Sequence, residues 1–259
     1  MAFKPASIFV PIGAPIMAFL IFVGEVSLIF ADAVRRCLRR PFEVVETVNQ
    51  MAFIGAASVP IVALTGFFSG AVLSLYLSEF LSEYHATTFV GATVGLTVTR
   101  EIGPVIAGIM VAARCGSAMA AQIGTMAVTE QMDALKMLSV HPTNYLVIPR
   151  IIAGVTMLPV LALVAMWAGI GGGLLVAGTE HIPYQSFMHS VVHYVKPEDI
   201  VRGMVKTPVF GLIIALVASQ QGMRTKDGAV GVGRATTNTV VISMILIYIT
   251  NFLLARVMY

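Results

Sequence analysis

Charged residues are scarce in this sequence. They make up 11% of its 259 residues, while hydrophobic residues make up 58%. A soluble domain carries about 25% charged residues, so this chain lacks the polar groups that would cover a globular surface in water. With a mean hydropathy of +0.89, the composition predicts an integral membrane protein. Its apolar runs are far longer than the roughly ten-residue alternating strands of a membrane barrel, so we expect an all-α protein.

Cysteine is also scarce, because only Cys37 and Cys115 occur. Two cysteines beside basic residues supply neither a disulfide framework nor a zinc site. We interpret both as thiols at the cytoplasmic ends of helices, without a functional role. The net charge of the chain is +3. Its basic residues lie at the edges of apolar runs, as the positive-inside rule predicts. No nucleic-acid partner is therefore expected.

Motifs for nucleotide and ester chemistry are missing. There is no GxxxxGK[ST] loop, so the chain is not expected to hydrolyse ATP itself, and no GxSxG occurs. His189 and His193 have the spacing of a metal pair, with His181 nearby, but no clear third ligand follows. We therefore expect no metal. The glycines at 228, 231 and 233 are interpreted as a flexible connector.

The first forty residues allow three interpretations. Residues 6–31 are apolar and Arg35–Arg40 follow. A signal peptide would use Ala31–Asp32–Ala33 for cleavage, but cleavage there would send four arginines across the membrane. A spanning helix is possible on length alone. We favour a kinked helix that lies in, or re-enters, the cytoplasmic leaflet and is anchored by the arginines, so residues 1–40 form an interfacial region.

Residues 41–259 are expected to form a five-span domain. Basic loops on one side and acidic loops on the other give a consistent alternation, with the arginines after residue 31 cytoplasmic and Tyr259 on the outer side. The expected spans are residues 51–78, 87–115, 147–178, 201–221 and 238–258.

The first span carries two patterns. Gly66 and Gly70 have the GxxxG spacing that permits close approach of another helix. An apolar stripe then continues past Glu79 and Glu83 to the aqueous edge. It either lines a lipid-sized cavity or is ordinary helix packing. The stripe consists of Leu73, Leu77, Phe80, Leu81 and Tyr84.

Two adjacent charges, Arg100 and Glu101, lie inside the second apolar run. Ionised residues at this depth cost several kcal/mol and are usually functional. Side chains at neighbouring positions on a helix point about 100° apart. Arg100 and Glu101 therefore cannot neutralise each other's charge alone and need other partners. Lys206, on the fourth span, is a plausible partner for Glu101. The three either line a substrate path or pin the helices together.

A short amphipathic segment follows the second span. Thr129 is expected to cap its start, with acidic residues in the first turn. It is either a helix that docks into a groove of a cytoplasmic partner or a solvated connector. The residues concerned are Thr129, Glu130, Gln131, Asp133, Leu135 and Lys136.

Several stretches together resemble the MlaE-type permeases of the Mla/MCE lipid transport systems of diderm bacteria, which have relatives in plastids. The first three of these stretches are TREIGPV, which starts at Thr99, ARCGSA, which starts at Ala113, and GTMAVTEQMDAL, which starts at Gly124. YLVIPR from Tyr145, GMVKTPVFG from Gly203 and GRATT from Gly233 continue the match. The resemblance covers most of the chain from about residue 41 to the end.

The resemblance implies an ABC transporter permease that moves phospholipid between the inner and outer membranes and so maintains outer-membrane lipid asymmetry. It implies a homodimer in the bacterial inner membrane, two copies of a separate ATPase that binds ATP and magnesium, a STAS-domain protein and a periplasmic MCE-domain hexamer. The chain itself would hold no cofactor and catalyse no reaction.

The same resemblance assigns residues to roles. Gly124–Leu138 would be the coupling helix for the ATPase, with Glu130, Gln131 and Asp133 on it, and the Arg100–Glu101–Lys206 group would lie near a lipid cavity at the dimer interface. Relatives commonly have an acid where this chain has Gln122, which argues against a carboxylate role there.

Two other functions remain open on the sequence. A secondary transporter would use Arg100 and Glu101 as an ion relay, and a scaffold would only anchor the MCE protein. A requirement for ATP in lipid transfer separates these alternatives from an ABC permease.

Overall fold

The computed structural model describes residues 6–37, 43–138 and 140–258, and all regular structure in these ranges is helical. This agrees with the all-α class that the composition predicts. The α-helices are α1 (Ala6–Cys37), α2 (Val44–Ile54), α3 (Val59–Glu83), α4 (Val90–Thr97), α5 (Gly103–Val111), α6 (Ser117–Val128), α7 (Gln131–Met137), α8 (Ile148–Thr179), α9 (Tyr184–Tyr194), α10 (Pro197–Met223) and α11 (Gly228–Met258).

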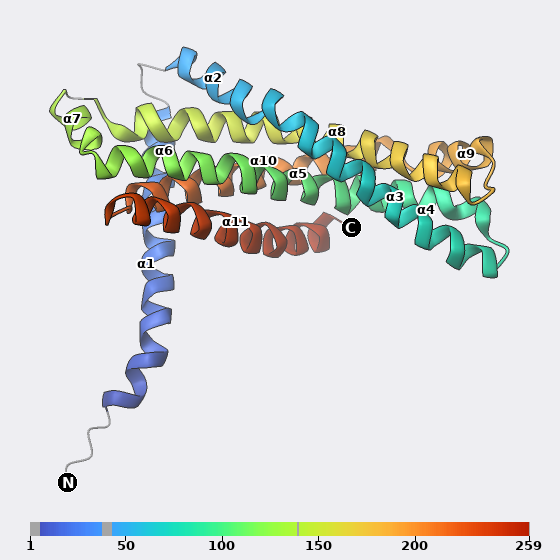
Figure 1. Cartoon of the computed structure of the whole chain (residues 1–259), viewed down its shortest axis with the longest axis horizontal. Helices are drawn as coiled ribbons and strands as arrows, with labels where there is room; N and C mark the ends of the chain where they lie inside the picture. The colour runs from blue at the N-terminus through green and yellow to red at the C-terminus, as the bar shows by residue number, and fades with distance from the viewer. Residues whose placement is uncertain (1–5, 38–42, 139, 259) are drawn as a thin grey trace, which may run out of the picture.

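Six helical segments in the described part are long and apolar enough to cross a membrane. Five of them form a bundle whose helices run side by side (Figure 1). The sixth, in α1, lies across the long axis of this bundle near the end that carries α7. That direction is the one expected of a helix lying along the membrane surface, although its length alone would allow it to span. The boundary expected between residues 40 and 41 lies outside the described residues, as do Arg39 and Arg40.

The second span is longer than the sequence indicated. Instead of ending near residue 115, the helical column runs from Thr87 to Val128 through α4, α5 and α6. The polar residues of α6 lie on its surface, while Met119 and Ile123 are buried. The placement of Cys115 at a helix end was therefore wrong. Its thiol is buried inside the bundle, 3.3 Å from the hydroxyl of Ser58.

The glycine-rich stretch after Lys226 is helical rather than a flexible connector. Gly228 begins α11 with a positive φ of 62°, which glycine adopts without the steric cost that a side chain brings. One turn later, a Cβ at Gly231 would collide with the carbonyl of Lys226. These glycines therefore make a tight turn into α11 possible.

Helices α3 and α8 pack backbone against backbone. Cβ atoms at Gly66 and Gly70 would collide with the carbonyl groups of Ala165 and Gly169, and one at Gly172 with that of Phe67. The close approach predicted from the GxxxG spacing is thus confirmed, with α8 as the partner. Around this contact lies the main core, which includes Val62, Leu161 and other buried residues of α5, α8 and α10.

Candidate functional site

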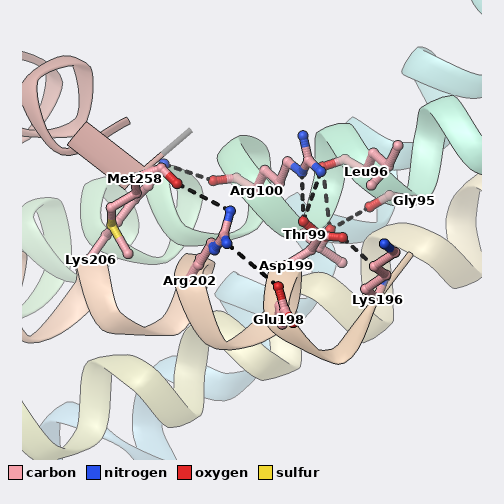
Figure 2. A network of polar contacts seen from close by, with 10 residues as sticks. All are labelled: Gly95, Leu96, Thr99, Arg100, Lys196, Glu198, Asp199, Arg202, Lys206 and Met258. Atoms are coloured by element: carbon pink, nitrogen blue, oxygen red, sulfur yellow. Dashed lines mark hydrogen bonds and ion pairs between the residues drawn. The ribbon is translucent and has the colours of Figure 1, made fainter. Parts of the chain in front are cut away.

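The two charges of the second span sit in a turn of π-helix, Val98–Ile102. Pro104 follows in the first turn of α5. Because proline has no N–H, the carbonyl of Arg100, four residues earlier, lacks its usual helical donor. The ammonium of Lys206 on α10 donates to this carbonyl at 3.0 Å (Figure 2). Pro104 therefore leaves the carbonyl of Arg100 free to accept a hydrogen bond from the buried Lys206. In addition, π-helical turns are frequent at functional sites.

Lys206 is the centre of this arrangement, and its side chain has no exposed surface. Its Nζ lies 2.7 Å from Oε1 of Glu101 and 3.5 Å from Oδ1 of Asn251 on α11. Asn251 Nδ2 in turn donates to the second oxygen of Glu101 at 2.7 Å. The pairing of Glu101 with Lys206 predicted from the sequence is confirmed, and it joins three spans.

Arg100 points to a different partner, Asp199 at the start of α10. Its Nε and Nη2 donate to Oδ1 of Asp199 at 2.9 and 2.8 Å. The other oxygen of Asp199 accepts the backbone N–H of Lys196 at 3.0 Å, which caps the helix (Figure 2). Both oxygens of this buried carboxylate are bound. Asp199 therefore holds the guanidinium of Arg100, which belongs to the second span, against the start of the fourth span.

A third tie lies one turn along α10. Arg202 donates to the carbonyl of Met258 at 3.2 Å and lies 3.5 Å from Glu198 (Figure 2). It holds the end of α11 beside the start of α10. We call the residues of these three ties the polar cluster: Arg100, Glu101, Asp199, Arg202, Lys206 and Asn251.

The polar cluster is closed on one side and open on the other. Lys206 and Asp199 are buried, whereas the side chains of Arg100 and Glu101 are each 38% exposed. Around it the helices are apolar. The partly exposed Arg100 and Glu101 can thus contact a polar group that enters between the helices. Their buried partners, Asp199 and Lys206, hold them in position.

The apolar stripe of α3 is divided in the structure. Leu73, Leu77 and Leu81 pack against a small core formed by α4, α8 and α9. For these three, ordinary helix packing accounts for the pattern. Phe80 and Tyr84 are exposed, with ring centroids 5.2 Å apart. Only this aromatic pair remains available to line a lipid cavity.

The short segment after the second span forms the helix α7, whose charged side chains are exposed. Its start differs from the prediction. The Thr129 hydroxyl donates to the carbonyl of Thr125 at the end of α6, and Glu130, with a φ of 58°, precedes the helix. Thr129 therefore ends α6 rather than starting α7. Met137 and Leu138, at the end of α7, are 88% and 74% exposed.

The family model described as "Permease MlaE" matches residues 47–257, which is most of the chain and includes the polar cluster and α7. The chain belongs to the MlaE permease family. It is thus a multi-pass membrane protein and a permease subunit of the ABC transporter class.

Relatives of this MlaE-family permease are named accordingly. A probable ABC transporter permease protein of Rickettsia felis is 43% identical over 250 residues, covering 96% of both chains. One from Synechocystis is 41% identical over 214 residues, covering 82% of this chain and 81% of its own. Protein TRIGALACTOSYLDIACYLGLYCEROL 1, chloroplastic, from Arabidopsis thaliana, is 35% identical over 232 residues, covering 89% of this chain and 66% of its own.

Three members of the permease's polar cluster, Asp199, Arg202 and Asn251, were not identified from the sequence. Asp199 falls between the expected third and fourth spans, although Lys196–Pro197 followed by acidic residues is a helix-start signal. Asn251 stands alone in an apolar run, and a single polar side chain there often bonds to another helix. Both signals were present, but neither identifies its partner.

The remaining candidates lie outside the cluster. The rings of His189 and His193 are stacked, with centroids 6.0 Å apart, on α9. The described residues contain no group of three or more His, Cys, Asp or Glu that could hold a metal ion. Gln122 accepts a hydrogen bond from Arg150 at 3.1 Å, so its amide binds a neighbouring cation.

Proposed function

We propose that this permease moves phospholipid between the inner and outer membranes, driven by a separate ATPase, and so maintains outer-membrane lipid asymmetry. The observation that carries the proposal is the half-open polar cluster. Charged groups inside an apolar bundle are costly unless they serve a path or a pairing, and here Arg100 and Glu101 keep exposed surface after pairing. A phosphate and its neighbouring polar groups would contact these side chains while the acyl chains stay among apolar ones such as Phe80 and Tyr84.

The partner ATPase would dock on α7. Exposed apolar side chains next to exposed charges are typical of a binding surface, and Met137 and Leu138 beside Asp133 fit this description. ATP and magnesium would be bound by the ATPase, since this chain has no phosphate-binding loop. We further propose a homodimer with two ATPase copies, a STAS-domain protein and a periplasmic MCE-domain hexamer. The α7 end would then be cytoplasmic and the C-terminus periplasmic, in the inner membrane.

The second span gives a physical route for coupling. Helix α7 follows α6 directly, and α6 is continuous with the column that carries Arg100 and Glu101. Two π-helical turns, Val98–Ile102 and Ala112–Gly116, interrupt the regular helix on the way. Displacing α7 would change the column at these turns and shift the polar cluster. Transport requires the resulting states to differ in lipid affinity.

Reconstituted lipid transfer tests this proposal. Transfer by the complex of permease and ATPase should require ATP, and Glu101→Gln and Lys206→Ala should each reduce it at least tenfold while the complex still assembles. If both variants transferred lipid normally, the cluster would be a structural pin only. Ion-dependent transfer without the ATPase would instead support a secondary transporter, and no transfer at all would support an anchoring role.

A further inference from the structure

Two basic side chains, Lys206 and Arg150, are buried in the described part of the chain. Lys206 pairs with Glu101. Arg150, at the start of α8, is 4% exposed and forms no ion pair within 4.0 Å with any described residue. A buried charge is costly unless it is paired and hydrogen-bonded, so Arg150 is the place in the chain where an added anion would stabilise most.

The guanidinium of Arg150 is only partly hydrogen-bonded. Nη1 donates to the carbonyl of Leu146 at 2.6 Å, and Nη2 donates to Oε1 of Gln122 at 3.1 Å. Its Nε is buried without a hydrogen-bond partner among the described residues. Nε and Nη2 form the edge of an arginine that binds a carboxylate through two parallel bonds. Arg100 uses this edge on Asp199, whereas the same edge of Arg150 holds one neutral amide.

Arg150 lines a cavity of about 540 Å³ beside α7. The walls come from the starts of α2 and α8, from α6, and from the turn Thr143–Val147 that follows α7. Thr125 and Met126 on the α6 wall belong to the last turns before α7. Figure 1 shows α7 at the same end of the bundle as the start of α2. The cavity therefore lies next to the surface on which a cytoplasmic partner would dock.

One carboxylate of this chain lines the cavity, but it is bound to another group. Glu46, in the first turn of α2, accepts a hydrogen bond on Oε1 from Nε2 of Gln50 at 2.8 Å. It forms no ion pair within 4.0 Å with any residue that the structure describes. The edge of Arg150 is thus left to an acceptor from outside the chain.

The size and lining of the cavity favour an acidic side chain over a free inorganic anion. A volume of about 540 Å³ is many times the roughly 30 Å³ that a water molecule takes in the liquid, so a phosphate or chloride ion would leave most of the cavity unfilled. Met126 and Leu146 provide apolar wall beside Arg150, which suits the CH₂ groups that carry a side-chain carboxylate.

We propose that this cavity receives an acidic side chain of the cytoplasmic partner that docks on α7, and that its carboxylate replaces the amide of Gln122 on Arg150. Gln122 is exposed, so its side chain can leave without repacking the core. The inference rests on the proposed docking of the ATPase and adds a second contact to it. The helices α2, α6 and α8 belong to three different spans, so a partner side chain held here contacts all three at once.

Gln122→Glu tests the edge without removing the buried cation. It supplies a carboxylate to Arg150 from within the chain, so the melting temperature of the permease in nanodiscs should not fall, while its affinity for the purified ATPase should fall at least tenfold. The matched control is Gln185→Glu, an exposed glutamine of α9, which makes the same change of charge and should bind the ATPase like the native chain. Unchanged binding by Gln122→Glu would overturn the proposal.

Glu46→Gln should have the opposite effect on binding. It removes a like charge from the cavity that the incoming acid enters, so the affinity for the ATPase should rise. If the affinity fell instead, the cavity would receive a basic side chain that pairs with Glu46, and the proposal would be wrong.

Arg150→Lys identifies the occupant. A carbodiimide joins an amine to a carboxylate in contact with it, so the amine introduced at this position should couple to an acidic residue of the ATPase in the assembled complex. Mass spectrometry of the linked peptides locates that residue. Coupling to Glu46 of the same chain, or no coupling in a complex that still holds the ATPase, would refute the proposal.

Asp133→Arg on α7 separates this inference from the docking on which it rests. If this variant binds the ATPase like the native chain, docking at α7 is wrong and the inference falls with it. If it loses the ATPase while Gln122→Glu retains it, docking at α7 stands and the contact with Arg150 alone is wrong. Loss from both variants, with the control unaffected, is the expected result.

Discussion

The ammonium of Lys206 lies 2.7 Å from a carboxylate oxygen of Glu101, although the lysine side chain has no exposed surface. This pair joins the second and fourth spans, and Asn251 joins the last span to it through the other oxygen of Glu101. A buried cation is tolerated here because one carboxylate, one amide and the carbonyl of Arg100 surround it. Removing the charge of either partner therefore affects stability as well as any lipid path.

Glu101→Gln should lower the free energy of unfolding by about 3 kcal/mol, because it leaves Lys206 as a buried cation without a counter-charge. Breaking a buried pair costs about 3–5 kcal/mol, and the lower end applies because Glu101 is partly exposed. Chemical unfolding in nanodiscs measures the loss. The double variant Glu101→Gln/Lys206→Met should recover part of it. If the double variant were no more stable than the single one, the unpaired cation would not be the cause.

Two neighbouring acids at the start of α10 should behave differently. Asp199 is 4% exposed and binds both Arg100 and the backbone of Lys196, and hydrogen bonds to charged groups contribute about 1.5–3 kcal/mol. Asp199→Asn should therefore cost about 2 kcal/mol. Glu198, whose side chain is 74% exposed, makes only a 3.5 Å contact with Arg202, so Glu198→Gln should cost less than about 0.5 kcal/mol. Thermal melting of both variants compares them, and equal shifts would contradict this reading of the cluster.

The sequence was sufficient for the class of protein and for part of the cluster. Arg100 and Glu101 were evident because charges inside an apolar run are costly, and Lys206 followed as the cation of another span. Asp199 was missed because residues 179–200 are polar enough to resemble a loop, although α9 and the start of α10 lie there. Pairing across helices depends on which helices are neighbours, and one sequence does not contain that information.

Helix boundaries show the same limit. The glycines at 228, 231 and 233 indicate a loop by composition, yet the structure uses them for a tight turn into α11. Likewise, the polar residues of α6 made the second span seem to end near residue 115. The GxxxG spacing of Gly66 and Gly70 predicted a close helix contact correctly, but its partner α8 became evident only from the folded chain.

The close contact between α3 and α8 can be tested by replacing a glycine inside the contact, and a second glycine outside it, with alanine. Gly70→Ala would place a methyl group against the backbone carbonyl of Gly169, which no side-chain rotation relieves. Overpacking of this kind costs about 1–3 kcal/mol. Gly171→Ala, where a Cβ meets nothing within 4 Å, should instead be neutral or gain up to about 1 kcal/mol of helix propensity. Melting temperatures of the two variants should move in opposite directions or differ by several degrees, and a tolerated Gly70→Ala would mean that the helices lie farther apart.

The surface of α7 can be tested without disturbing the fold. Asp133 forms a 2.8 Å pair with Lys136, but both side chains are largely exposed, and such pairs contribute about 0–1 kcal/mol. Asp133→Arg should therefore leave the melting temperature of the permease almost unchanged. On co-purification with its co-expressed ATPase, the same variant should retain at least tenfold less partner, because the added charge lies beside the exposed Met137 and Leu138.

The matched control for this substitution is Glu180→Arg, an exposed acid in the cap of α8 at the opposite end of the bundle. It makes the same change of charge, so any effect on expression or detergent extraction should be shared by both variants. Loss of the ATPase from the Asp133→Arg variant alone would locate the ATPase docking site at α7. Loss from both variants would attribute the effect to net charge, and loss from neither would remove α7 as the contact through which ATP hydrolysis reaches the polar cluster.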